Sequence, residues 1–105
     1  MDMENKIMEL IINGGDARGK ALQAISSANK NEFGQAEVFL KECADSLHKA
    51  HTIQTELIQA EINGDDKVSV SLLMVHAQDH LMNAITVKDL AEQMIALAKI
   101  VHKQN

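Results

Sequence analysis

The residues best suited to chemistry lie together in the C-terminal third of the chain, in the run His76-Ala77-Gln78-Asp79-His80. On an α-helix, positions i, i+3, i+4 and i+7 share one face. The polar residues that this spacing places on one face are His76, Asp79, His80 and Asn83. The surrounding segment is strongly apolar, which predicts that this polar stripe is at least half-buried. Two imidazoles and a carboxylate in such a setting need hydrogen-bond partners, a metal ion or a reaction.

His76 is the candidate reactive residue, because neutral imidazole is a good nucleophile near neutral pH. A carboxylate at i+3, here Asp79, can orient a nearby ring or raise its basicity. The spacing alone leaves three interpretations open. The first is a structural histidine in an interface, the second is a metal site formed by His76, Asp79 and His80, and the third is covalent chemistry at His76.

Three other residues carry groups that bind metals or react. Cys43 falls in the apolar register of its predicted helix, which favours a buried structural thiol. His48 and His51 are about one turn apart and could bind a metal, but exposed or interface polar residues are the favoured interpretation.

Composition indicates an all-α protein. The 105 residues include no Pro, Trp or Tyr, and good helix formers dominate. The formal charge of −5 argues against nucleic-acid binding. Unbroken apolar runs such as Leu72 to Val75 are far too short to span a membrane, and no secretory signal is visible. A single cysteine cannot form an internal disulfide, which suits a reducing compartment, so we expect a cytoplasmic protein. The length of the chain is enough for one domain with one core, over residues 1–105.

Three helices are predicted, over about residues 2–28, 31–63 and 66–103. Asn13-Gly14-Gly15 interrupts the first, but the apolar register continues with Gly14 on the core side, which favours one helix approached closely by a neighbour. Gly64 suits a left-handed C-terminal cap, and Asp65 or Asp66 is expected to cap the third helix. Short links make sequential helices antiparallel, so the chain predicts an up-down-up three-helix bundle.

The third helix has more apolar surface than a three-helix bundle can cover. Its predicted core face consists of Val70, Leu73, Ala77, Leu81, Ala84, Ala91 and Ile95. A second apolar set shares the face of the polar stripe and consists of Leu72, Val87, Leu90, Met94 and Leu97. A helix that is apolar on two sides is usually covered on two sides, and no fourth helix is predicted to cover it. Self-association is therefore expected, with the polar stripe at or beside a subunit interface.

The segment Val68–Met82, which contains the polar stripe, resembles the active-site helix of the IIA component of lactose/cellobiose-type phosphotransferase systems. These systems are bacterial sugar importers that depend on phosphoenolpyruvate. The stretches Leu10–Arg18 and Ala50–Ile58 are similar to the same family, and the resemblance covers essentially the whole chain. It implies a homotrimer of three-helix bundles, which agrees with the second apolar face of the third helix.

The resemblance also implies roles for single residues. His76 would carry a phosphoryl group on a ring nitrogen, received from the phosphocarrier protein HPr and passed to a cysteine of the IIB subunit, the partner of the membrane IIC subunit. Asp79 would converge from three subunits near the threefold axis and share a divalent metal, expected to be Mg²⁺. His80 and Gln78 match motif positions near the phosphohistidine. His80 could donate a hydrogen bond to phosphoryl oxygens, whereas Gln78 lies about 200° from His76 and is expected to contact another helix or subunit.

The function implied is that of a phosphocarrier in the uptake of a β-linked disaccharide. The IIA subunit never contacts the sugar, so the sugar itself cannot be read from this chain. A non-catalytic oligomeric helical adaptor, with a structural metal held by the His-Asp-His stripe, is the alternative from a different class. A two-component histidine phosphotransfer domain is disfavoured, because the basic residue and glycine that usually follow its histidine are absent here.

Overall fold

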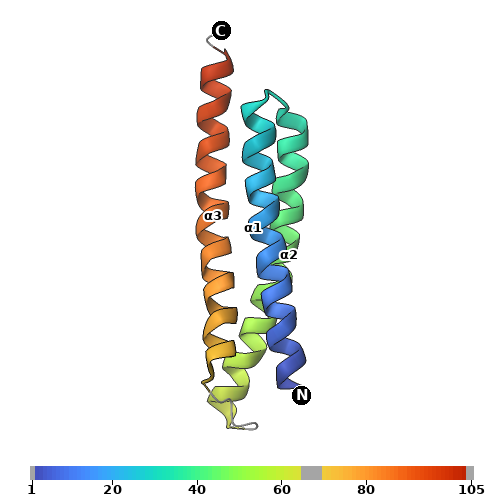
Figure 1. Cartoon of the computed structure of the whole chain (residues 1–105), viewed down its shortest axis with the longest axis vertical. Coiled ribbons are helices and arrows are strands. Elements are labelled where there is room, and N and C mark those ends of the chain that lie inside the picture. The colour runs from blue at the N-terminus through green and yellow to red at the C-terminus, as the bar shows by residue number, and fades with distance from the viewer. Residues whose placement is uncertain (1, 65–69, 104–105) are drawn as a thin grey trace.

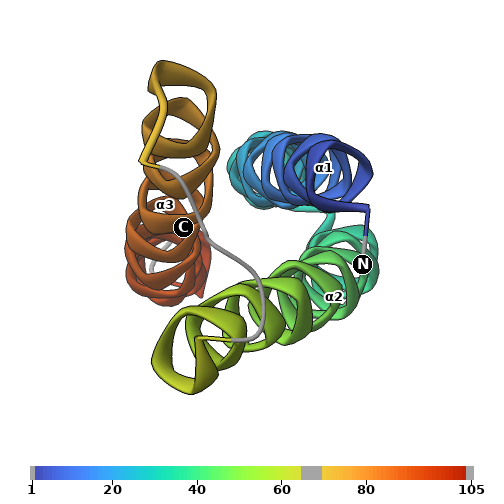
Figure 2. The same cartoon turned by 90° about the horizontal axis from the view of Figure 1, so that it is seen from below.

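The computed structural model describes residues 2–64 and 70–103, which form a bundle of three long helices (Figure 1). Helix α1 spans Met3–Asn29, α2 spans Phe33–Asn63 and α3 spans Leu72–Lys103. Their directions alternate along the bundle, so α1 and α3 are parallel and α2 is antiparallel to both. Seen along the bundle, the helices occupy the corners of a triangle (Figure 2). The predicted all-α, up-down-up architecture is confirmed.

Local signals in the sequence set the ends of the helices. The side chain of Asp2 accepts a hydrogen bond from the backbone N–H of Asn5 at 3.3 Å and caps α1. Gly64 ends α2 with φ of 68°, the left-handed conformation that glycine adopts without steric penalty. The predicted cap of the third helix, Asp65 or Asp66, lies outside the described residues. Helix α3 begins later, at Leu72, where the Ser71 hydroxyl accepts from the Met74 N–H at 3.1 Å.

The core runs along the bundle as three clusters of buried side chains. Large residues fill the end that contains Leu10 and Leu81, whereas alanines dominate the middle and the other end. Small side chains let helices approach closely, so the narrow bundle measures 58 × 20 × 16 Å. No helix in the described part of the chain combines the length and hydropathy that crossing a bilayer requires.

The predicted core face of α3 needs two corrections. Val70 is 80% exposed because it precedes the first residue of the helix, and Leu73 is 38% exposed. Met74, which the sequence prediction omitted, is buried in place of Leu73. The inward stripe of a packed helix drifts by about 20° per heptad, so the face extrapolated from the middle of α3 is rotated away from the core at its first turn. The remaining predicted core residues are buried, namely Ala77, Leu81, Ala84, Ala91 and Ile95.

The second apolar face of α3 is largely uncovered within one chain. Leu72, Leu90, Met94 and Leu97 are all about half exposed or more. Val87 is the exception, because it is half-buried and packs against the cluster that contains Ala17 and Cys43. The predicted excess of apolar surface on α3 is therefore confirmed for four of its five residues.

Candidate functional site

The polar stripe of α3 lies on the outer side of the bundle. His76, Asp79 and Asn83 are exposed and His80 is half-buried. The burial predicted from the apolar surroundings is therefore met at His80, but the chain's own helices do not provide it for His76, Asp79 or Asn83. The stripe shares its helix face with the exposed residues Leu72 and Leu90, which leaves both the polar and the apolar side chains accessible to other subunits or partner proteins.

The two histidines contact each other directly. Nε2 of His76 lies 3.1 Å from Nε2 of His80, and the rings meet edge to face with centroids 4.5 Å apart and planes at 88°. A nitrogen–nitrogen hydrogen bond needs one donor and one acceptor, so one of these two nitrogens carries a proton and the other presents its lone pair. The geometry therefore holds His76 in one orientation and places a potential N–H donor beside its ring nitrogen.

Helix α1 packs against the part of α3 that carries this histidine pair. Gly14 is buried, and a Cβ atom added there would lie 3.3 Å from the backbone carbonyl carbon of His80 and 3.4 Å from its Cβ. Contacts this short are tighter than normal packing, so only glycine fits without a shift of α3. Helix α1 continues without a break through Gly14 and Gly15. The predicted close approach of a neighbour at Gly14 is confirmed, and the neighbour is the backbone that carries the histidine pair.

A hollow of about 340 Å³ opens at the histidines. It is lined by Arg18, His76, Asp79, His80 and Asn83. Four of these residues come from α3 and form the predicted stripe, whereas Arg18 comes from α1. Our sequence prediction assigned no role to Arg18. A signal was available, because Arg18 is the only arginine in the chain and lies four residues after Gly14.

Gln78 lies away from this hollow. It is half-buried, and its side-chain oxygen accepts a hydrogen bond from Nε2 of Gln54 on α2 at 2.8 Å. This agrees with the expectation that Gln78 contacts another helix, since it is about 200° from His76 around α3. The structure of one chain therefore does not bring Gln78 to the His76 ring.

A metal site built by one chain finds no support in the described residues. Within them, no group of three or more His, Cys, Asp or Glu side chains is arranged to hold a metal ion. The rings of His76 and His80 contact each other instead, and Asp79 provides a single exposed carboxylate. A site formed by Asp79 from three subunits requires the assembly and stays a prediction.

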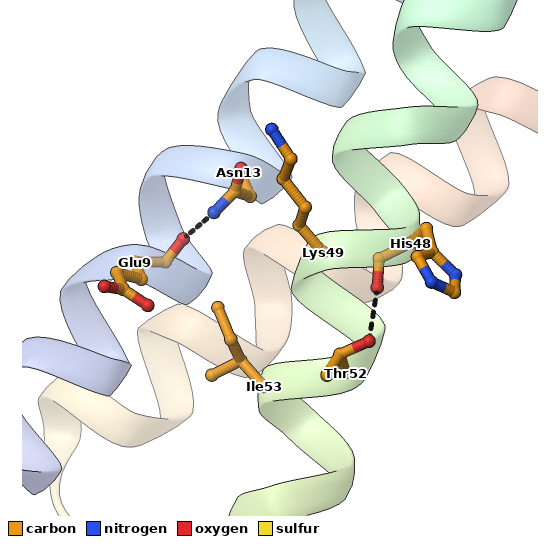
Figure 3. A pocket seen from close by; sticks show the side chains of 6 residues that line it. All are labelled: Glu9, Asn13, His48, Lys49, Thr52 and Ile53. Atoms are coloured by element: carbon orange, nitrogen blue, oxygen red, sulfur yellow. Dashed lines mark hydrogen bonds between the residues drawn. The ribbon is translucent and has the colours of Figure 1, made fainter.

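A second groove lies between α1 and α2 (Figure 3). Its volume is about 490 Å³, and it is lined by Glu9, Asn13, His48, Lys49, Thr52 and Ile53. The Asn13 and Thr52 side chains donate to backbone oxygens of their own helices, and the His48 ring points away from α1 (Figure 3). The polar groups do not converge on a point in the groove, as a site for a small ligand requires. His48 and His51 are both exposed, as expected of surface histidines.

Cys43 is part of the core and not of a reactive site. It is fully buried in the cluster with Ala17 and Ala84. Burial raises the pKa of its thiol, because the charged thiolate loses its hydration there. The prediction of a buried structural thiol is confirmed.

Together, the fold and the site define a class of protein, a three-helix bundle that presents a histidine pair on an open face of its last helix. The family model described as "PTS system, Lactose/Cellobiose specific IIA subunit" matches residues 5–99. The chain belongs to this family of phosphotransfer proteins, which confirms the resemblance found in the sequence.

Similar proteins agree over nearly the full chain. The lichenan-specific phosphotransferase enzyme IIA component of Bacillus subtilis is 47% identical over 103 residues, which are 98% of this chain and 93% of that protein. The crystal structure of the cellobiose-specific enzyme IIA from Bacillus anthracis has a TM-score of 0.95 and 40% identity, and the match covers 100% of this chain and 95% of that one. The IIA(chitobiose) in its complex with HPr from Escherichia coli has a TM-score of 0.80 and 34% identity, with 97% and 98% covered.

Proposed function

We propose that this chain accepts a phosphoryl group from HPr on His76 and passes it to a cysteine of the IIB subunit during uptake of a β-linked disaccharide. The observation that carries the proposal is the contact between Nε2 of His76 and Nε2 of His80 on an exposed face of α3. An exposed nucleophile suits a carrier, because two different proteins must reach the same phosphorus atom in turn.

The relatives support the partner and the class of sugar. The solution structures of a IIA(chitobiose) were determined as its complex with HPr, and that protein is 34% identical to this chain over the matched region. Cellobiose and N,N'-diacetylchitobiose, which two of the similar structures are named for, are both β-linked disaccharides. We therefore propose HPr as the donor and a β-linked disaccharide as the transported sugar.

The chemistry requires little of the chain beyond a nucleophile and a donor. The lone pair of a His76 ring nitrogen attacks phosphorus, the bond from phosphorus to HPr breaks, and its electron pair stays with HPr. In the second transfer, a thiolate of IIB attacks phosphorus and the phosphorus–nitrogen bond returns its electron pair to the His76 ring. Both steps pass through a loose in-line transition state that depends on positioning and local charge. His80 can turn its N–H from the His76 ring to a phosphoryl oxygen once that oxygen is present.

The proposal includes assembly as a cytoplasmic homotrimer that acts, through IIB, with the membrane IIC subunit. The exposed face of Leu72, Leu90, Met94 and Leu97 is the candidate contact between subunits. Asp79 shares this face, so three copies can meet near an axis, where like charges need protons or a cation. Carboxylate oxygen is the ligand that Mg²⁺ prefers, so Asp79 is the residue that would hold it.

Phosphorylation by purified general phosphotransferase proteins and phosphoenolpyruvate tests the proposal. Wild type and a His48→Ala control should acquire acid-labile, alkali-stable phosphate, as expected of a phosphohistidine. His76→Ala should fold and trimerise but acquire none. Labelled phosphate on His76→Ala would contradict the assignment to His76. The absence of phosphate on wild type would favour the adaptor class instead.

A further inference from the structure

Arg18 reaches the histidine hollow from a different helix. It lines that hollow with His76, Asp79 and Asn83 and is the only arginine of the chain. No lysine from residues 2–64 or 70–103 lines the hollow. Among the residues that the structure describes, Arg18 is therefore the only basic side chain besides the histidines at the site where a phosphoryl group would be attached.

The packing of α1 on α3 determines where Arg18 lies along the bundle axis, relative to the residues of α3. Gly14 abuts the His80 backbone, and Arg18 follows it by four residues on the same face of α1. Four residues rise by about 6 Å along a helix. Helices α1 and α3 are parallel (Figure 1). This rise therefore places Arg18 beside the turn of α3 that follows His80, and Arg18 lines the hollow together with Asn83 of that turn. A long guanidinium side chain at this level can reach the hollow without any movement of the backbone.

Arg18 is not engaged elsewhere in the described part of the chain. Every ion pair there is formed by a lysine and a glutamate, from Lys6, Lys20, Lys88 and Lys99. No hydrogen bond among the described residues uses the Arg18 guanidinium, and its side chain is exposed. An uncommitted guanidinium beside a reactive histidine is available to bind an anion when one arrives.

The phosphoryl group has the charge and shape that a guanidinium recognises. A phosphoryl group carries between one and two negative charges near neutral pH, and on His76 it would lie beside the carboxylate of Asp79. A nearby cation lowers the repulsion between these two anions. Arginine presents two parallel N–H donors to two phosphoryl oxygens, which lysine cannot do.

We propose that Arg18 binds the phosphoryl group carried by His76 and stabilises it during both transfers. The inference rests on the proposed function, because it assumes that His76 is the residue phosphorylated. Arg18 would act from α1 while His80 acts from α3, so the phosphoryl oxygens would be held from two sides.

The test compares Arg18→Gln and Arg18→Lys with a Lys20→Gln control. Lys20 lies two residues further along α1 and pairs with Glu42 on α2, so the control removes the same charge outside the hollow. Phosphorylation is measured with phospho-HPr and with potassium phosphoramidate, a small donor that has no protein surface to dock. From both donors, Arg18→Gln should be slowed roughly 100-fold, as when a preorganised donor to a reacting oxygen is removed. Arg18→Lys should be intermediate, and Lys20→Gln should stay within about twofold of wild type.

A second readout separates direct binding from a structural effect. Phosphorus NMR follows the titration of the phosphoryl group on each phosphorylated protein. A neighbouring guanidinium favours the dianion, so the second phosphoryl pKa should be higher in Arg18→Gln than in wild type and in Lys20→Gln. Circular dichroism should show unchanged helix content, because Arg and Gln are both good helix formers.

Equal phosphoramidate rates and equal phosphoryl titrations for Arg18→Gln and Lys20→Gln would overturn the inference. Slower transfer from phospho-HPr alone would also overturn it, since it would mean that Arg18 contacts HPr and not the phosphoryl group. If wild type and Lys20→Gln acquire no phosphate from either donor, the proposed function fails and the inference fails with it. That outcome differs from the failure of Arg18 alone, in which the wild type is labelled normally.

Discussion

Gly14 of α1 packs directly against His80 of α3, so that a Cβ atom at position 14 would lie 3.3 Å from the carbonyl carbon of His80 and 3.4 Å from its carbonyl oxygen. This contact sets the height of α1 relative to the histidine pair. It also determines which residues of α1 can reach the hollow at His76. A change at Gly14 therefore tests whether the position of α3 matters for the proposed phosphoryl transfer.

The Gly14→Ala variant is expected to be both strained and slow in phosphoryl transfer. Alanine should favour the helix by about 1 kcal/mol over glycine, but its Cβ meets backbone atoms of His80 at 3.3–3.4 Å. Gly15→Ala is the matched control, since a Cβ there has no neighbour within 4 Å. Thermal and denaturant unfolding should show Gly15→Ala to be stabilised by up to about 1 kcal/mol and Gly14→Ala to be less stable than Gly15→Ala. Equal stabilities and equal phosphorylation rates for the two variants would mean that α3 shifts to accommodate the added methyl group at no cost in stability.

The Asp79→Leu variant tests the proposed meeting of three carboxylates. If three copies of Asp79 meet at an axis, leucine removes their repulsion and the need for a metal. Replacing a buried charge cluster with apolar side chains is often neutral or stabilising, by about 1–4 kcal/mol. The variant should stay trimeric in a chelator, as measured by sedimentation. Dissociation to monomers at the same concentration, with or without Mg²⁺, would contradict the proposed position of Asp79.

The Leu90→Glu variant tests the proposed trimer contact. Leu90 is 56% exposed in one chain and shares its face with His76. Burying a leucine side chain is worth roughly 1.5–3 kcal/mol, and a glutamate from each subunit would add mutual repulsion. Sedimentation should show a strongly weakened trimer, whereas circular dichroism should show largely unchanged helix content. Phosphoryl acceptance should fall as well if two subunits build the surroundings of His76.

A glutamate at a comparable position outside this face serves as the control. Val38 on α2 is 51% exposed, and Val38→Glu should leave the trimer intact. A trimer mass that is unchanged in Leu90→Glu would show that the subunits meet through another face. Loss of the trimer with full phosphoryl acceptance would show that one chain is sufficient for the site.

Cys43 predicts how stability depends on alkaline pH. Burial raises the pKa of its thiol above the ordinary value near 9.0, so the unfolded chain loses this proton first as the pH rises. The unfolded state then binds fewer protons than the native state, and the free energy of unfolding falls with increasing pH above about 9. Cys43→Ala lacks this contribution. Denaturant unfolding should therefore show wild type losing stability relative to Cys43→Ala across the alkaline range above about pH 8. A constant difference across that range would mean that the thiol ionises equally in both states.

The sequence by itself determined the features that depend on the geometry of a single helix. The polar stripe of His76, Asp79 and His80 follows from the helical repeat, because residues three and four apart always share a face. The stop at Gly64 follows from the backbone freedom of glycine, and the core position of Gly14 follows from the apolar register around it. Each of these signals is local, so each could be recognised without knowledge of how the helices pack.

Only the tertiary structure decided which helices bring which residues to the histidines. Arg18 lines the hollow because of the position of α1 along the axis of α3. The contact between Gly14 and His80 is one part of the packing along the whole interface that determines this position. The rotation of α3 about its own axis determines that Met74 is buried and that Leu73 is not. Periodicity gives the face of an isolated helix, but rotation and height relative to a neighbour depend on interlocking side chains from both helices, which no single segment of sequence contains.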